Sequence, residues 1–298
     1  MNIKSWISAI RLRTLPLSLS CILMGGALAN TFTCIDVVVF MLIIITTILL
    51  QILSNLANDY GDGIKGTDDQ RVGPDRMIQK GLISKKEMFT AICLVGGFTF
   101  ISGLTLLYKV FGLNYILASF LFLTLGIFAI WAAIKYTMGR NPYGYKGLGD
   151  LFVFIFFGVI GVMGSFYLLN STWNWITIPG SIFTGCLSMG VLNMNNMRDH
   201  DSDKLTGKKT LVVKYGLKWA SKYQIFLIAI SFTSILVITI SSKLNWSYFC
   251  LLPLPILLSN IYKVISYKNS IELDSELKKI ALSTFTISLI FFVITMLK

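Results

Sequence analysis

Long apolar stretches without charge alternate with short polar stretches along almost the whole chain. A helix needs about 17 to 25 apolar residues to cross the hydrocarbon core of a bilayer. Nine stretches reach that length, namely residues 15–32, 37–58, 89–108, 115–134, 151–169, 176–194, 223–240, 246–262 and 280–297. The pattern predicts an all-α fold, a polytopic transmembrane bundle of about nine helices that forms a single domain over residues 1–298.

Composition and charge support a membrane location. Only 13% of the residues are charged, whereas an ordinary soluble domain has about 25%. The net charge of +12 can indicate nucleic-acid binding, but the positions of the basic residues argue against that partner. If the N-terminus is cytoplasmic, 23 of the 26 Lys and Arg residues fall in cytoplasmic segments, as the positive-inside rule requires. We therefore expect a protein of the lipid bilayer, with its N-terminus inside and its C-terminus outside.

Two polar connections, residues 59–88 and 195–222, are longer than the others. Both begin near Asn and Asp at the end of a span, continue through Gly and Thr, and end in basic residues. This similarity predicts a four-plus-four pseudo-repeat with a ninth helix appended. Internal repeats commonly place the binding site at their interface, so we expect the two connections to face each other. The five scattered cysteines and single histidine do not favour a disulfide framework or a zinc site.

Amide and carboxylate side chains repeat at helical spacing in both connections. They are Asn55, Asp59 and Asp62 in the first, and Asn195, Asp199 and Asp203 in the second. Spacings of four, seven or eight residues place each set on one helix face if the helix continues past the bilayer. Carboxylates stacked on one face repel each other, so two stacks predict a bound cation, and oxygen ligands indicate Mg²⁺. We assign all six side chains as metal ligands and the four aspartates as catalytic residues.

Mg²⁺ usually bridges a few carboxylates to substrate phosphates, which makes a diphosphate the expected partner. The alternative is that these acids merely end the spans and pair with neighbours such as Lys65, Arg198 or Lys204. Two clusters matched in position and spacing favour a functional site over that alternative. Other acids fall off the predicted faces and rank below these, namely Asp68, Asp69, Asp75 and Asp201.

Basic and aromatic residues near the acids are candidates for the diphosphate and for a carbocation. Membrane topology alone explains most of the basic residues. A third polar hairpin, residues 135–150, is rich in Gly and Tyr, and its tyrosine rings can face a cation, although tyrosines are also common at membrane interfaces. The diphosphate candidates are Arg71, Arg76, Lys146 and Lys208, and the candidates for stabilising a cation are Tyr143 and Tyr145.

Four segments together resemble the UbiA superfamily of intramembrane aromatic prenyltransferases, and most closely its 1,4-dihydroxy-2-naphthoate polyprenyltransferase branch. They read RLRTLP (11–16), NLANDYGDGIKGTD (55–68), PYGYKGLGD (142–150) and NMNNMRDHDSDKLTGKKTLVVKYG (193–216). The broader superfamily tends to have Tyr where Asn195 stands here, and Asn at this position is typical of the naphthoate branch. The resemblance extends over nearly the whole chain.

The resemblance implies a helical bundle around a central cavity, with Mg²⁺ on the paired Asp motifs and a lateral opening for the prenyl tail. It implies transfer of a polyprenyl group from polyprenyl diphosphate to 1,4-dihydroxy-2-naphthoate, with release of diphosphate and CO2, giving demethylmenaquinone. Arg11 or Arg13 is then the candidate to hold the acceptor's carboxylate. The implied location is the bacterial cytoplasmic (inner) membrane, with the active site on the cytoplasmic side.

Two other functions remain open from the sequence. A related enzyme with another acceptor, such as 4-hydroxybenzoate or homogentisate, would have similar diphosphate-binding residues. A secondary transporter also has repeats and buried polar groups, but it typically places ionisable residues near the bilayer midplane. The predicted spans of this chain carry no charge, and its acids lie at their ends, which favours an enzyme at the membrane face.

Overall fold

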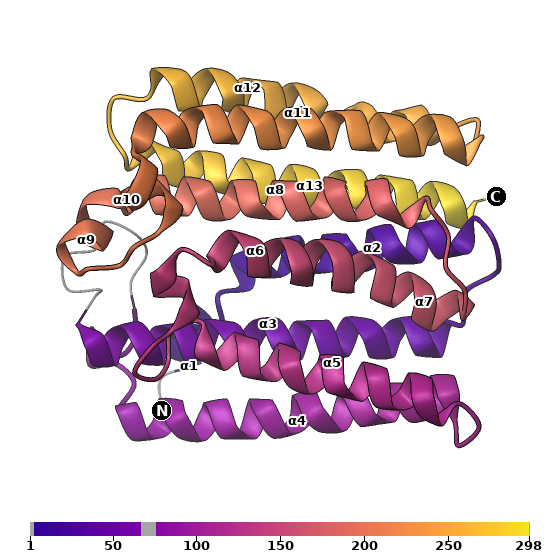
Figure 1. The fold of residues 1–298 in the computed structure, drawn as a ribbon, viewed down its shortest axis with the longest axis horizontal. Coiled ribbons are helices and arrows are strands. Elements are labelled where there is room, and N and C mark those ends of the chain that lie inside the picture. The colour runs from indigo at the N-terminus through magenta and orange to yellow at the C-terminus, as the bar shows by residue number, and fades with distance from the viewer. Residues whose placement is uncertain (1–2, 67–75, 298) are drawn as a thin grey trace.

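The computed structural model describes residues 3–66 and 76–297, and every regular element within them is helical (Figure 1). The proposed diphosphate ligand Arg71 lies outside the described residues, as do Asp68, Asp69 and Asp75. The α-helices are α1 (Ile3–Ile10), α2 (Leu15–Asn30), α3 (Val37–Lys65), α4 (Lys85–Phe111), α5 (Ile116–Lys135), α6 (Gly149–Val153), α7 (Ser165–Asn170), α8 (Thr177–Arg198), α9 (His200–Leu205), α10 (Leu211–Tyr215), α11 (Leu217–Ser242), α12 (Leu254–Ser266) and α13 (Glu272–Met296). A π-helical stretch, Phe154–Gly164, joins α6 to α7.

Eight helical segments of the described chain are long and apolar enough to cross a membrane. They match eight of the nine predicted spans, and the ninth span is α8, which has 22 residues or about 33 Å of helix. α8 is rich in Gly, Ser, Thr and Asn, and it is surrounded by α2, α11, α13 and the π-helical stretch. Small and polar residues are typical of helix contacts inside a membrane bundle. The predicted nine-helix bundle is therefore confirmed.

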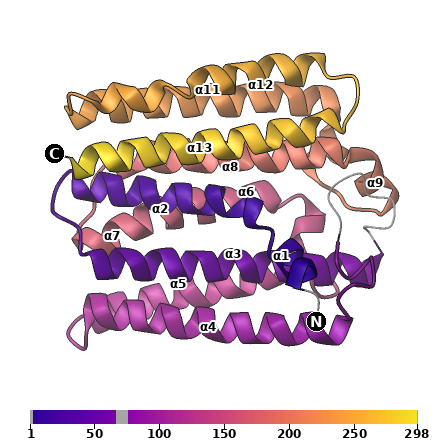
Figure 2. The same ribbon diagram turned by 180° about the vertical axis from the view of Figure 1, so that it is seen from behind.

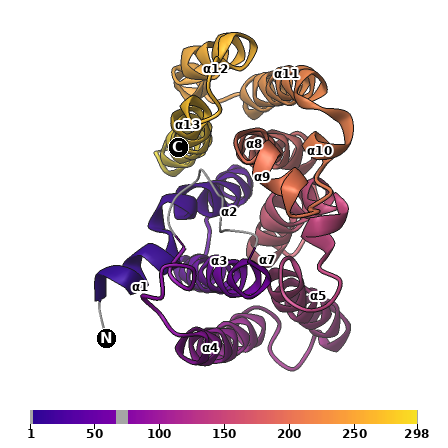
Figure 3. The same cartoon turned by 90° about the vertical axis from the view of Figure 1, so that its left-hand side faces the viewer.

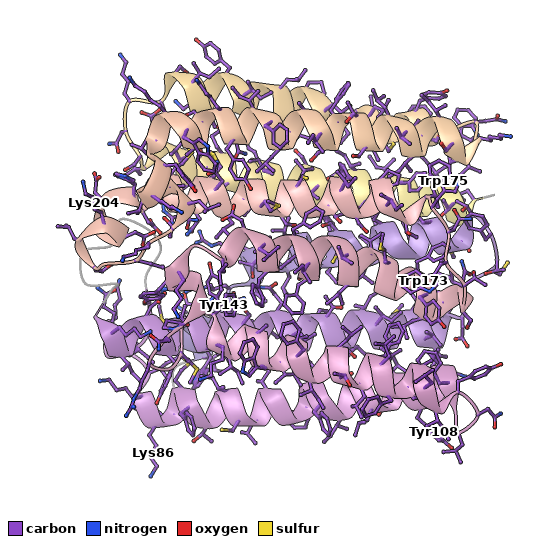
Figure 4. The ribbon with its side chains drawn as sticks, viewed as in Figure 1. Lys86, Tyr108, Tyr143, Trp173, Trp175 and Lys204 are labelled. Carbon is purple, nitrogen blue, oxygen red and sulfur yellow. The ribbon has the colours of Figure 1, made fainter. Side chains whose placement is uncertain are left out.

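The spans run along the long axis of the molecule, and the two chain ends lie at opposite ends of the bundle (Figure 1). α9 and α10 gather at one end, which we call the polar end, and Figure 2 shows α1 beside α3 at the same end. Lys86 and Lys204 project there, whereas Tyr108, Trp173 and Trp175 lie at the other end (Figure 4). An odd number of spans requires this separation of the chain ends.

Some helices continue beyond the predicted spans. α3 runs on to Lys65 and ends at Gly66, which has a φ of 69°, a left-handed conformation that glycine adopts without a Cβ clash. α4 begins already at Lys85, because Ser84 and Glu87 form a reciprocal capping box. The apolar pattern marks where the bilayer ends, whereas capping groups mark where the helix ends.

The second predicted helix face is not one continuous helix, which corrects the sequence prediction. α8 ends at Arg198, and Asp199 leaves helical geometry with φ −92° and ψ 8° before α9 begins. Asp and Ser residues, which are poor helix formers, follow at this point. The Asp199 N–H still donates to the Asn195 carbonyl (3.0 Å), and the Asp203 N–H donates to the Asp199 carbonyl (2.8 Å). The four-residue spacing therefore survives the break.

The helix packing follows the predicted pseudo-repeat. Each helix that ends in acidic residues packs extensively along the helix that follows it as a span, α3 along α4 and α8 along α11. Viewed end-on, α3, α4 and α5 lie on one side and α8, α11, α12 and α13 on the other, with α2 between them (Figure 3). A large apolar core joins α2 with the second group, and a smaller one joins α1, α3 and α4.

Candidate functional site

The first acidic motif lies at the end of α3 that reaches the polar end of the bundle. Because α3 is continuous, Asn55, Asp59 and Asp62 share one face, and all three are buried. A Cβ at Gly61 would lie 2.5 Å from the Thr137 hydroxyl oxygen, and a Cβ at Gly63 would lie 2.7 Å from a methyl group of residue 78. These two glycines therefore let neighbouring segments close tightly around the motif.

Both carboxylates of the first motif are hydrogen-bonded. Asp59 accepts the backbone N–H groups of residues 77–78, at 3.0 and 3.2 Å. Asp62 accepts one hydrogen bond from the Arg76 guanidinium (3.0 Å) and one from the Tyr145 hydroxyl (2.7 Å). Asp62 and Arg76 are both almost completely buried. The predicted residues Asp62, Arg76 and Tyr145 are thus brought into direct contact.

Asn55 connects this motif with the N-terminal segment. Its amide nitrogen donates to the Ile10 carbonyl (2.8 Å) and to the Thr14 hydroxyl (2.9 Å). Between these two residues, Arg11 adopts a left-handed conformation with φ 53°, which is uncommon for a side chain with a Cβ. Arg13 lies 3.6 Å from a carboxylate of α13 and is partly exposed. The RLRTLP segment is therefore folded onto the site.

The second acidic motif is organised around Arg198. Its guanidinium forms a bidentate pair with Asp199, at 2.7 and 2.8 Å, and also donates to the Asn195 side-chain oxygen at 2.8 Å. A third nitrogen bonds Asp274 at the start of α13. The side chain of Arg198 is 1% exposed, so a permanent charge is buried beside the motif. The pairing of Arg198 with a motif acid, which the sequence offered as the alternative to a functional site, is therefore present, whereas Asp274 is a partner that the sequence did not indicate.

The two motifs meet at Tyr145. Lys65 at the end of α3 lies 4.3 Å from the centre of its ring, and Lys208 beyond α9 lies 5.2 Å from it. Lys208 also lies 3.6 Å from Asp203. The Lys209 N–H donates to the Tyr145 carbonyl at 3.0 Å, which ties the third hairpin to the second motif. The two connections face each other, as predicted from the repeat.

The third hairpin adds aromatic rings and a basic pocket. Tyr143 stacks on Phe152 at 4.0 Å and contacts Tyr136 edge-on, and its hydroxyl donates to the Ala132 carbonyl. Burial raises the pKa of both tyrosine hydroxyls, so both stay protonated at neutral pH. Lys146 is exposed and lines a small pocket of about 300 Å³ beside Lys65, Arg140 and Tyr145.

An apolar cavity of about 580 Å³ begins at this site and extends into the bundle. Asn55, Asn58, Tyr136 and Tyr143 line it near the polar end, whereas Trp173 lines it near the opposite end. Its walls come mainly from α2, α3, α4, α5 and the π-helical stretch, and most of the lining surface is apolar. Several lining residues are exposed on the bundle, namely Phe100, Leu104, Leu121 and Ile127.

The donor atoms of the two motifs suit a hard cation that shares its coordination with a substrate. Within residues 3–66 and 76–297, no three Asp, Glu, His or Cys side chains converge closely enough to hold an ion by themselves. The motifs instead offer separate carboxylates and amide oxygens. Mg²⁺ is usually bound in this way, by one or two carboxylates, waters and substrate phosphates. The residues therefore fit a magnesium diphosphate better than an enclosed metal.

Asp201 is the one lower-ranked acid within the described residues, and it is directed away from the motif carboxylates. The Asp201 side chain is 97% exposed and pairs with His200, whereas Asp199 and Asp203 are buried. From the sequence, Arg198 is only one possible partner of these acids, and its burial in the second motif was not predicted. One signal was available, because Arg198 is a basic residue directly before an aspartate at the end of a long uncharged span, where a buried charge needs a partner.

Residues 18–290 match the UbiA prenyltransferase family. The chain is 39% identical to a 1,4-dihydroxy-2-naphthoate octaprenyltransferase of Haemophilus influenzae, over 97% of this chain and 95% of that protein. It is also 39% identical to the Escherichia coli protein of the same description, over 97% and 94%. The fold resembles a UbiA homolog from Aeropyrum pernix (TM-score 0.68, 14% identity, 100% and 98% coverage). It also resembles one from Archaeoglobus fulgidus bound to GPP and Mg²⁺ (TM-score 0.67, 14% identity, 98% of each chain). The chain belongs to the UbiA prenyltransferase family.

Proposed function

We propose that this protein transfers a polyprenyl group from polyprenyl diphosphate to 1,4-dihydroxy-2-naphthoate, with release of diphosphate and CO2, giving the hydroquinone form of demethylmenaquinone, which air oxidises to the quinone. The observation that carries the proposal is the meeting of two acidic motifs at the polar end of one long apolar cavity. A donor with a charged head and a long hydrocarbon tail needs both environments side by side. The identity to 1,4-dihydroxy-2-naphthoate octaprenyltransferases supports the choice of acceptor.

The diphosphate is placed between the two motifs. Asp59, Asp62, Asp199 and Asp203 are the carboxylates that would hold Mg²⁺, with Asn55 and Asn195 as amide ligands. When bound, Mg²⁺ neutralises the charge that develops on the leaving diphosphate. The proposed ligands of the phosphate oxygens are Arg71, Arg76, Lys146 and Lys208.

Arg76 and Lys208 already lie next to motif carboxylates, at 3.0 Å from Asp62 and 3.6 Å from Asp203. A cation beside a carboxylate can exchange that partner for a phosphate oxygen, because both are oxyanions. The site thus contains anionic metal ligands and cationic phosphate ligands in contact before substrate arrives. This arrangement limits the reorganisation that binding requires.

The cavity protects and receives the prenyl cation. Tyr143 lines the cavity, with its hydroxyl bonded to the Ala132 carbonyl and its ring stacked on Phe152. An aromatic face stabilises a cation, and the apolar walls exclude water that would otherwise capture it. The electron-rich carbon of the naphthoate then attacks, with its carboxylate held by Arg11 or Arg13. Exposed lining residues such as Leu121 and Ile127 mark where the tail would leave toward lipid.

The reaction is tested with purified protein, a polyprenyl diphosphate and 1,4-dihydroxy-2-naphthoate in liposomes. We expect release of diphosphate and a prenylated naphthoquinone by mass spectrometry, both abolished by a Mg²⁺ chelator and restored by excess Mg²⁺. 4-Hydroxybenzoate in place of the naphthoate serves as the acceptor control. A product formed only with 4-hydroxybenzoate, or no diphosphate release with either acceptor, contradicts the proposal.

The proposed orientation places the polar end in the bacterial cytoplasm. It rests on the 23 basic residues that share this side of the predicted topology. Cys34 is exposed in the connection between α2 and α3, at the opposite end. A membrane-impermeant maleimide added to intact spheroplasts is therefore expected to label Cys34, with Cys34→Ser as the control. Labelling of Cys34 only after the membrane is permeabilised contradicts this orientation.

A further inference from the structure

Asp274 joins the second acidic motif to the N-terminal segment. It lies in the first turn of α13, where one of its oxygens accepts a hydrogen bond from Arg198. Its other oxygen lies 3.6 Å from the Arg13 guanidinium. The Asp274 side chain is 38% exposed, whereas that of Arg198 is 1% exposed. The buried guanidinium is thus shared between two carboxylates, Asp199 inside the site and Asp274 at its edge.

Arg198 occupies the oxygen atoms that a metal at the second motif would need. It bonds both carboxylate oxygens of Asp199, at 2.7 and 2.8 Å, and the side-chain oxygen of Asn195, at 2.8 Å. The guanidinium keeps its charge at any physiological pH. Leaving such a charge buried without an anionic partner is strongly unfavourable. A cation that binds Asp199 must therefore compete with Arg198, unless Arg198 retains another carboxylate.

We propose that Asp274 is a positioning residue that retains Arg198 when Mg²⁺ takes the oxygens of Asp199 and Asn195. The inference rests on the proposed function, because it assigns Mg²⁺ to the second motif. With Asp274 in place, the guanidinium keeps one carboxylate partner throughout the exchange. Without Asp274, Arg198 depends on Asp199 alone for its charge compensation. Asp274 therefore increases the affinity of the second motif for Mg²⁺ without being a ligand.

The start of α13 offers a matched control for a purely structural role. Glu272 lies in the same first turn and pairs with Lys263 of α12 rather than with Arg198. Its side chain is 36% exposed, close to the 38% of Asp274. Replacing either acid by its amide removes one negative charge from the same turn of the helix. Only the replacement at Asp274 changes the partners of Arg198.

The experiment measures metal binding to the purified protein in detergent, with a saturating non-reactive prenyl thiodiphosphate analogue and without acceptor. The melting temperature is followed against Mg²⁺ concentration, and Mn²⁺ binding is measured by electron paramagnetic resonance. Asp274→Asn is expected to raise the half-saturating concentration of both ions about fivefold or more. Glu272→Gln is expected to leave both values unchanged. Asp274→Glu keeps the carboxylate and is expected to retain most of the wild-type affinity.

Each outcome bears on the proposal. Equal titrations for the wild type and Asp274→Asn overturn it, as does an equal loss of affinity in Glu272→Gln. If Asp274→Asn does not fold in detergent, Asp274→Ser takes its place in the same titration, with the same expected shift. A wild-type protein that shows no Mg²⁺-dependent stabilisation and binds no Mn²⁺ contradicts the metal site of the proposed function itself. That result is distinct from the failure of Asp274 alone.

Discussion

α4 and α5 in the first half of the bundle occupy places equivalent to those of α11 and α12 in the second half, yet the two pairs are buried to different extents. The most apolar windows of α4 and α5 are 17% and 11% buried, against 39% for α11 and 33% for the span Ser247–Ser266, which ends with α12. The cavity accounts for part of this difference, because α4 and α5 line it together with α2 and α3. The cavity thus lies between the helices α2 to α5 and the π-helical stretch, whereas α11 to α13 are more fully packed.

Polar side chains fill the second half. Asn193 donates to Gln224 (2.9 Å), Gln224 to Asn260 (3.4 Å) and Asn260 to Glu276 (3.3 Å). This buried chain connects α8, α11, α12 and α13. Hydrogen bonds between helices hold a bundle together where apolar contacts with neighbours and with lipid are nearly equivalent. Hydrogen bonds thus hold α8 to α11, α12 and α13 in the second half, whereas the cavity lies on the side of α4 and α5.

The first test, with the largest expected effect, asks whether both halves of the bundle supply a carboxylate that activity requires. Asp59→Asn and Asp199→Asn are each expected to reduce Mg²⁺-dependent prenyl transfer about 100-fold or more, because each removes a charged metal ligand. Initial rates at saturating Mg²⁺ measure the effect, and melting temperatures check the fold. The control is Asp201→Asn, whose side chain is 97% exposed. Full activity in Asp59→Asn or in Asp199→Asn contradicts the proposal that both motifs bind the metal.

A second test concerns the buried charge of the second half. Arg198→Gln is expected to lower the free energy of unfolding by about 3–5 kcal/mol, because it breaks a buried ion pair. Mg²⁺ is expected to restore part of the stability by supplying the missing positive charge. Thermal unfolding in detergent measures both effects. Lys109→Gln, which breaks an exposed pair with Asp36, is expected to change the stability far less, because water and salt screen exposed pairs. Equal losses for the two variants contradict this account.

A third test concerns the contact between the halves. Tyr145→Phe removes the hydrogen bond to Asp62 but keeps the ring beside Lys65 and Lys208. Hydrogen bonds to charged groups contribute about 1.5–3 kcal/mol, so we expect activity to fall about tenfold. Tyr145→Leu also removes the ring and is expected to fall further. Steady-state rates compare the two variants, and wild-type activity in Tyr145→Phe means that the hydroxyl does not position Asp62.

A fourth test, with the smallest expected effect, concerns the apolar cavity. Gly103 lines the cavity, and nothing lies within 4 Å of the position of its Cβ. Gly103→Leu is expected to raise the KM for long prenyl diphosphates about fivefold by filling the cavity, and to leave that for short donors unchanged. Gly97 lies on the same helix, has the same open surroundings and does not line the cavity. Kinetics with donors of two lengths should therefore separate Gly103→Leu from Gly97→Leu.

The amino-acid sequence by itself determined the helical class, the nine spans and the parts of the chain that form the polar end. Charge-free stretches of membrane length have few alternatives to a spanning helix, because every backbone polar group must be satisfied within it. Spacings of four and then three residues likewise fixed the shared face of Asn55, Asp59 and Asp62, since α3 is continuous. These are properties of local sequence, and local physical rules are sufficient to predict them.

Only the tertiary structure decided which charges are partners. Arg198 and Asp274 are separated by 76 residues, and Tyr145 bonds Asp62 across 83 residues. No spacing rule connects such positions, because their contact depends on how the helices pack. The same is true of the cavity, because its walls come from five segments that are spread along the chain, α2, α3, α4, α5 and the π-helical stretch. The sequence locates the acids, and the packing determines what surrounds them.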